Sequence, residues 1–245
     1  MNILDHFFLK VLIPIKIGPL NLSITNLTVW MLTAVGILFL AMFYYSRKIT
    51  IIPKTGQNVL EMIVEFIRDN IAKSTMGVDA KYWWPFIGTL FLFILVNNLI
   101  GILPNSYVPS SNIIFSATLA IMVFFVVQIA GIAKTGIKGY LKNFFVPGVP
   151  KWLWIFIVPI EIVTSLAKPF SLLIRLTANM LAGHIVIIVV ISLITFFKNY
   201  FIAIPVVFFA LLICLFEIFV SAVQAYIFSI LTATYIKMII HPKNL

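Results

Sequence analysis

The side chains most able to do chemistry in this sequence are a few polar residues that lie inside long apolar runs. Arg175 is the clearest case, because a guanidinium stays cationic in essentially any protein environment. If its run crosses a membrane, the embedded charge costs about 2.5–3.5 kcal/mol on insertion scales. Asn179 follows one helical turn later and shares the same helix face. Arg175 therefore needs either an acidic partner or a function.

Both interpretations of Arg175 stay open at this point. Glu161 and Glu217 are the candidate acids within the long apolar runs. Glu161 lies fourteen positions before Arg175, which is about 21 Å along a helix. Arg175 therefore either forms a static salt bridge within its own helix bundle or is a cation with a functional role.

A histidine and a glutamate form a second candidate pair. His184 lies nine positions after Arg175, about half a turn around a helix, and so faces away from the arginine. In the next apolar run Glu217 and Gln224 are seven positions apart and share one stripe. A histidine and a glutamate on adjacent membrane helices could pass protons along a hydrated path. The alternatives are a static hydrogen bond between them and, for Gln224, an amide that simply holds two helices together.

The composition indicates that the bilayer is the solvent of this chain. Its 245 residues are 62% hydrophobic and 10% charged, with a mean hydropathy of +1.15, whereas soluble proteins average about 45–50% apolar and about 25% charged residues. The net charge of +10 does not predict nucleic-acid binding, because the basic residues fall mostly between the apolar runs, as membrane topology requires. The first 18 residues lack a small-residue cleavage site, so we expect insertion through the internal segments.

No pattern for catalysis or cofactor binding is found in the sequence. It contains no glycine-rich phosphate loop, no Ser/His/Asp set and no His/Cys cluster. The single cysteine, Cys214, lies within an apolar run and is expected to be a buried, inert thiol. We therefore expect no catalytic residue, no metal and no cofactor.

The apolar runs predict an all-α integral membrane protein, with residues 1–245 forming a single membrane domain. Five transmembrane helices are expected, at residues 24–46, 83–103, 112–133, 151–198 and 202–241. A continuous helix over the fourth run would be roughly 70 Å long, more than twice the bilayer core of about 30 Å. Each of the last two runs either breaks into two crossings or forms one long, steeply tilted helix. We favour tilted helices, because no polar turn interrupts the fourth run.

Residues 55–76 have a different pattern and predict an interfacial amphipathic helix. Glu61, Glu65, Arg68 and Lys73 recur at helical spacing opposite an apolar stripe. With this segment on the surface, five crossings leave twelve Lys and Arg residues on one side, three on the other and two, Lys168 and Arg175, embedded. The positive-inside rule then places the N-terminus outside and the C-terminus inside.

Three segments carry a resemblance to a known family. Residues 168–184 (KPFSLLIRLTANMLAGH) closely resemble the signature of subunit a of F-type ATP synthase. Residues 98–104 (NLIGILP) and 224–232 (QAYIFSILT) agree with the same family, and the match runs over most of the chain in the right order.

The resemblance implies a role for each polar residue. Arg175 corresponds to the essential arginine that faces a rotating ring of c subunits, with Asn179 and Gln224 in its neighbourhood. Glu217 and His184 fall on the polar pair of an access channel, in the order found in mitochondrial and alphaproteobacterial relatives. Glu161 falls on the acid near the start of the long helix. Gly101 departs from the acid that some bacterial members have at its position.

The expected function is that of a stator subunit of the proton channel, which supplies two aqueous half-channels to the c-ring and is not catalytic alone. The implied partners are c-ring subunits, peripheral-stalk b subunits, other membrane subunits of the complex, protons and the bilayer. The expected location is a bacterial or mitochondrial inner membrane. The alternative functions are a stand-alone channel or secondary transporter, which usually shows internal repeats, a proton-pumping subunit of a respiratory complex, and a structural scaffold.

Overall fold

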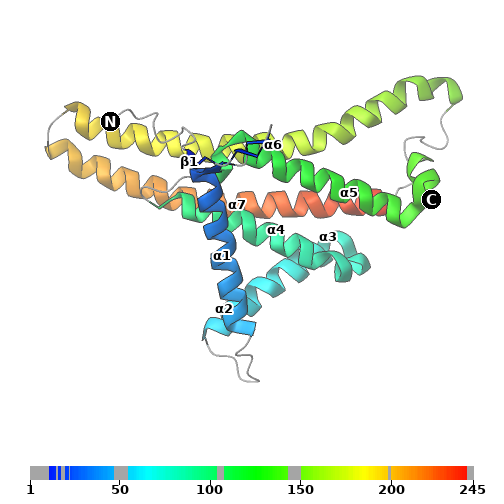
Figure 1. The fold of residues 1–245 in the computed structure, drawn as a ribbon, viewed down its shortest axis with the longest axis horizontal. Coiled ribbons are helices and arrows are strands. Elements are labelled where there is room, and N and C mark those ends of the chain that lie inside the picture. The colour runs from blue at the N-terminus through cyan, green and yellow to red at the C-terminus, as the bar shows by residue number, and fades with distance from the viewer. Residues whose placement is uncertain are drawn as a thin grey trace. The chain divides into compact units, whose positions relative to one another are not determined.

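The computed structural model describes residues 11–14, 16–17, 20–21, 23–46, 55–103, 108–142, 150–197 and 200–241. Most of them are helical (Figure 1). The α-helices are α1 Asn26–Ser46, α2 Thr55–Glu65, α3 Ser74–Met76, α4 Ala80–Gly101, α5 Ile113–Lys142, α6 Trp154–Phe197 and α7 Tyr200–Ile240. A π-helical segment, η2 Phe66–Lys73, and the short 3-10 segments η3 Gly77–Asp79, η4 Pro109–Ser111 and η5 Lys151–Leu153 lie between them.

Short strands precede the first helix. β1 Val11–Ile13 pairs with β4 Ile24–Thr25, and β2 Lys16–Ile17 pairs with β3 Leu20–Asn21, both antiparallel. These strands were not predicted from the sequence, because two or three residues are too few to show an alternating pattern.

The described part of the chain contains five helical stretches long and apolar enough to cross a membrane. They are Asn26–Tyr44, Gly56–Gly101, Ile113–Tyr140, Trp154–Ile194 and Ala203–Ile240. This confirms the predicted all-α membrane fold with five apolar helices.

α6 and α7 are long, uninterrupted helices. They contain 44 and 41 residues, and at about 1.5 Å per residue each spans roughly 60–66 Å. Pro159 and Pro169 lie inside α6 and Pro205 inside α7 without ending either helix. The last predicted residue of the fourth run, Lys198, lies outside the described residues. Each run therefore forms one helix, and its steep tilt in the bilayer stays a prediction.

α5 is longer than the sequence predicts. It continues past Ala133 to Lys142, through a stretch that we expected to be a connector. Gly136 has φ 71° and ψ 165°, so the helix is kinked at this residue. Glycine adopts positive φ without the steric penalty of a Cβ, and the lysines that follow are good helix formers.

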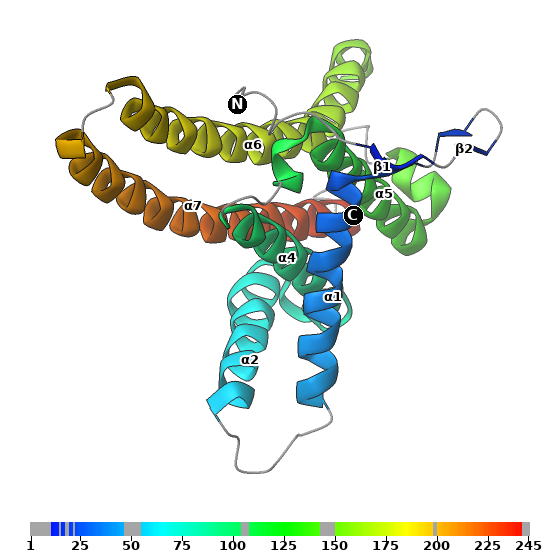
Figure 2. The ribbon, with the colours of Figure 1, turned by 60° about the vertical axis from the view of Figure 1, so that its left-hand side comes forward.

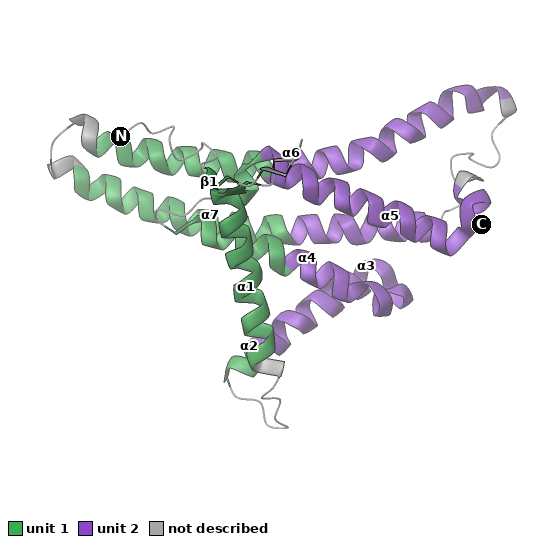
Figure 3. Cartoon of the chain, in the orientation of Figure 1, with its two compact units in different colours: residues 1–59, 92–112, 177–225 green, residues 60–91, 113–176, 226–245 purple. Residues whose placement is uncertain are grey.

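The chain forms two compact units, and four of its helices, α2, α4, α6 and α7, contribute residues to both (Figure 3). Unit 1 comprises residues 1–59, 92–112 and 177–225, and unit 2 comprises residues 60–91, 113–176 and 226–245. Within unit 1, the C-terminal part of α6 and the N-terminal part of α7 lie side by side (Figure 2).

In unit 2 the amphipathic segment packs through its apolar face onto α4. The ring of Phe66 lies 6.2 Å from that of Phe91, and Ile67 is buried against Gly88. The opposite face is exposed and holds Asp69 in ion pairs with Arg68 and Lys73, at 3.1 and 3.8 Å. Part of this segment, η2, is π-helical, which the periodicity did not predict. Its position on the membrane surface stays a prediction.

Candidate functional site

In unit 1 the two predicted amides bond to each other. Asn179 of α6 donates a hydrogen bond from Nδ2 to Oε1 of Gln224 on α7, at 2.9 Å. Gln224 is 2% exposed, and its own Nε2 has no partner among the described residues. Asn179 itself is exposed, so the bond is partly buried, and an amide hydrogen bond of this kind holds two apolar helices together at this level. The structure thus brings together Asn179 and Gln224, forty-five residues apart in the sequence.

Glu217 is a buried carboxyl group on α7 in the same unit. It is 5% exposed, and its Oε2 has no hydrogen-bond partner among the described residues. Its Oε1 lies against α6 at Gly183, so closely that a Cβ on that glycine would be 2.7 Å away. The residue after Gly183 is His184, which is half-buried. Glu217 therefore packs against α6 at the turn that carries the predicted histidine.

Arg175 lies on the part of α6 that belongs to unit 2. It is half-buried, and the adjacent Leu172 and Leu176 are almost fully buried. The salt bridges found among the described residues involve Arg68, Lys73, Lys134 and His241 as cations, and none involves Arg175. Glu161, the acid of unit 2 that we weighed as its partner, is also absent from these salt bridges. A static salt bridge to Glu161 is thus excluded as the reason for Arg175.

The other embedded cation has a structural explanation. The Nζ atom of Lys168 lies 5.5 Å from the centroid of the Tyr235 ring, within unit 2. A cation over an aromatic face gains electrostatic stabilisation, which is larger where water is excluded. The two embedded basic residues therefore differ. Lys168 has a local partner, whereas Arg175 has no acidic partner among the residues of its unit that the structure describes.

Sequence reasoning missed three residues of unit 1 that the structure draws attention to. Asn98 is 1% exposed, and neither its Oδ1 nor its Nδ2 has a partner among the described residues. Ser221 is fully buried and its Oγ is likewise without a partner there. Ser221 lies one helical turn after Glu217, a spacing that could have revealed it. Gly183, the third, has no sequence signal beyond its place before His184.

Gly101 has a packing reason for lacking a side chain. A Cβ at this position would lie 2.7 Å from Cγ2 of Val108, inside van der Waals contact. The segment therefore has no room for the acid that some relatives carry here.

The described polar residues of this region are of the kinds that can exchange protons. They offer a carboxyl group, an imidazole, amides and hydroxyls inside apolar helices, which are the groups of proton relays in membranes. Among the described residues no group of three or more His, Cys, Asp or Glu could hold a metal ion.

Comparison with known proteins agrees with these features. The family model described as ATP synthase A chain matches residues 27–237. ATP synthase subunit a of Magnetococcus marinus is 40% identical over 245 residues, covering 98% of this chain and 93% of that protein. The subunit a proteins of Chloroherpeton thalassium and Myxococcus xanthus are 44% and 40% identical over 91% and 90% of this chain, covering 68% and 74% of their own lengths. Because the family match runs from the first membrane helix into the last turn of α7, the chain belongs to the ATP synthase subunit a family, the proton-translocating, non-catalytic subunits of the F0 sector in energy-transducing membranes.

Proposed function

We propose that Arg175 is the fixed cation past which a ring of c subunits carries protons between two aqueous half-channels of this subunit. The observation that supports the proposal is that Arg175 lies in an apolar helix without an acidic partner in the described part of its unit. An uncompensated charge there is expensive. A transient carboxylate on a moving partner would compensate it.

A ring carboxyl group must be neutral while it faces lipid, because the ionised form costs several kcal/mol there. At this subunit one half-channel protonates the carboxylate and the other accepts its proton. The positive charge of Arg175 stabilises the ionised form between these two events.

The same charge prevents a short circuit. A fixed guanidinium repels a proton that would otherwise pass directly from one half-channel to the other. Net proton flow then requires the ring to turn, and the turning ring drives ATP synthesis in a separate catalytic head.

We assign the other polar residues to the paths that lead to the ring. Glu217 and His184 form the proton-accepting pair of one half-channel. The bond between Asn179 and Gln224 holds α6 and α7 at a fixed separation near the arginine. Glu161 is the acid near the start of α6. The partners in this proposal are the c-ring, the peripheral-stalk b subunits and other membrane subunits of the complex.

The experiment is ATP-driven proton pumping by the reconstituted complex. Arg175→Ala should abolish pumping while the complex still assembles, and Arg175→Lys should also fail, because a compact ammonium hydrates and loses its proton more readily than a guanidinium. Lys168→Gln is the matched control, since it removes a cation from the same helix. It should retain most of the pumping. Normal pumping by an assembled Arg175→Ala complex would refute the proposal.

A further inference from the structure

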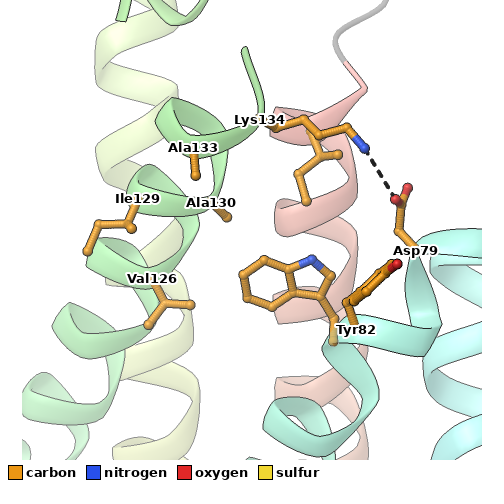
Figure 4. Close-up of a pocket in the computed structure, with 9 residues that line it drawn as sticks. Asp79, Tyr82, Val126, Ile129, Ala130, Ala133 and Lys134 are labelled. Carbon is orange, nitrogen blue, oxygen red and sulfur yellow. Dashed lines mark ion pairs between the residues drawn. The ribbon is translucent and has the colours of Figure 1, made fainter. Parts of the chain in front are cut away.

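A cavity in unit 2 is lined by none of the residues that we assign to the proton path. Its volume is about 390 Å³, and it lies where the start of α4, the second half of α5 and the end of α7 meet (Figure 4). One wall is apolar and consists of Val126, Ile129, Ala130 and Ala133 of α5. This size lies within the range of small-ligand pockets, about 300–1,000 Å³.

Two aromatic residues and two opposite charges complete the cavity. Tyr82 and Trp83, at the start of α4, also line the cavity, and Asp79 and Lys134 form an ion pair at its edge (Figure 4). Tyrosine and tryptophan are enriched where the hydrocarbon of a bilayer meets the headgroups. The cavity thus has an apolar part for hydrocarbon and a charged edge at headgroup level.

The charged edge has unused hydrogen-bonding capacity. The Nζ atom of Lys134 lies 3.5 Å from Oδ1 of Asp79, and His241 bonds to Oδ2 of the same carboxylate. An ammonium group has three donors, and a carboxylate has about four acceptor positions. After their mutual contact, Lys134 can still donate to an anion and Asp79 can still accept from a cation.

We propose that this cavity binds one phospholipid with a zwitterionic, primary-amine headgroup, of the phosphatidylethanolamine type. Lys134 binds the phosphate, Asp79 accepts a hydrogen bond from the ammonium, and one acyl chain lies along the wall of α5.

The paired charges select this headgroup over the common alternatives. Phosphatidylglycerol has no cation for Asp79, whose carboxylate would repel its net negative charge. Phosphatidylcholine has a quaternary ammonium without an N–H, so it cannot donate the hydrogen bond that Asp79 is placed to accept.

The experiment uses the assembled complex in vesicles of equal parts phosphatidylethanolamine, phosphatidylglycerol and phosphatidylcholine. A trace of phosphatidylethanolamine carries a photoactivatable group at the start of one acyl chain, and mass spectrometry quantifies adducts on residues 126–134. Unlabelled phosphatidylethanolamine should suppress these adducts about fivefold better than either other lipid, the discrimination expected of one headgroup charge contact. Asp79→Asn should remove this preference, and Lys134→Gln should lower the adduct yield by about the same factor.

Two further variants separate binding in the cavity from general contact with lipid. Ala133→Phe fills the cavity and should remove most adducts. Ile132→Phe adds the same side chain at the next residue, which is 39% exposed and does not line the cavity, and should leave them unchanged. Three results would overturn the proposal: equal competition by the three lipids, equal losses in the two phenylalanine variants, or no adducts in the assembled complex because a partner subunit fills the cavity.

Discussion

The carboxylate of Glu217 on α7 lies against α6 at Gly183, and the absence of a side chain on this glycine is what allows it to do so. An added Cβ would come within 2.7 Å of Oε1 and 3.2 Å of Cδ. Few Cβ atoms in proteins approach another atom this closely, so either the carboxylate or the helix would have to move. The contact places an ionisable group of α7 beside the turn of α6 that carries His184.

We therefore predict that Gly183→Ala slows proton flux several-fold. The nearest atom is the far end of the flexible Glu217 side chain, so the carboxylate moves aside and loses its position relative to His184. Proton flux through reconstituted vesicles, normalised to assembled complex, measures the effect. Gly36→Ala is the matched control, because nothing lies within 4 Å of a Cβ at that helical position of the same unit. Equal flux in the two variants would show that the contact between Glu217 and Gly183 does not affect proton flux.

His184 and Glu217 should behave as one functional pair. His184→Ala or Glu217→Ala should each lower proton flux more than it lowers assembly. The double exchange, His184→Glu with Glu217→His, should recover part of the loss because it keeps one acid and one imidazole. A double exchange no better than the worse single change would mean that the two residues do not couple.

The hydrogen bond between Asn179 and Gln224 should contribute a measurable coupling energy. Hydrogen bonds between membrane helices average about 0.6 kcal/mol and reach about 1.7 kcal/mol in double-mutant cycles. Asn179→Leu, Gln224→Leu and the double variant, followed by unfolding in mixed micelles, give this value. We expect it near the average, because Gln224 is almost fully buried whereas Asn179 is exposed. A coupling indistinguishable from zero would contradict the assigned bond.

The five-span topology predicts that Glu61 and Lys138 lie on the inner side. Both residues are exposed in the structure. Glu61→Cys and Lys138→Cys, each in a Cys214→Ser background, should react with a membrane-impermeant thiol reagent only from the inner side. Ile121→Cys, at an exposed apolar position within α5, should react from neither side. Labelling of position 138 from the outer side would overturn the topology.

The sequence predicted the large features of the fold because hydrophobic length is a strong signal. An apolar run of about 20 residues reports a crossing regardless of its neighbours, which is why the five apolar helices could be identified. The helical extension to Lys142 and the π-helical turn at Phe66–Lys73 follow from local backbone geometry. The lysines and glycines around Gly136 are typical of a connector, so the sequence did not predict the extension of α5. The residue spacing in η2 is that of an ordinary α-helix, so the sequence did not predict the π-helical turn.

The candidate site could be predicted residue by residue but not contact by contact. Embedded polar residues such as Arg175 and Glu217 stand out in apolar sequence, because each is costly to bury. The partner of each depends on packing between helices distant in the sequence. The bond from Asn179 to Gln224, the ring of Tyr235 under Lys168 and the contact of Glu217 with Gly183 all arise in this way.

The central claim is that the charge of Arg175 forces protons to travel with the ring, and passive proton conductance tests it most directly. The membrane sector without its catalytic head is reconstituted in vesicles, a voltage is imposed, and ring rotation is blocked by a cross-link to the stator. The wild-type sector should then conduct no protons, whereas blocked Arg175→Ala should leak, because the electrostatic barrier between the half-channels is gone. If the blocked Arg175→Ala sector conducts protons no faster than the blocked wild type, the account is contradicted.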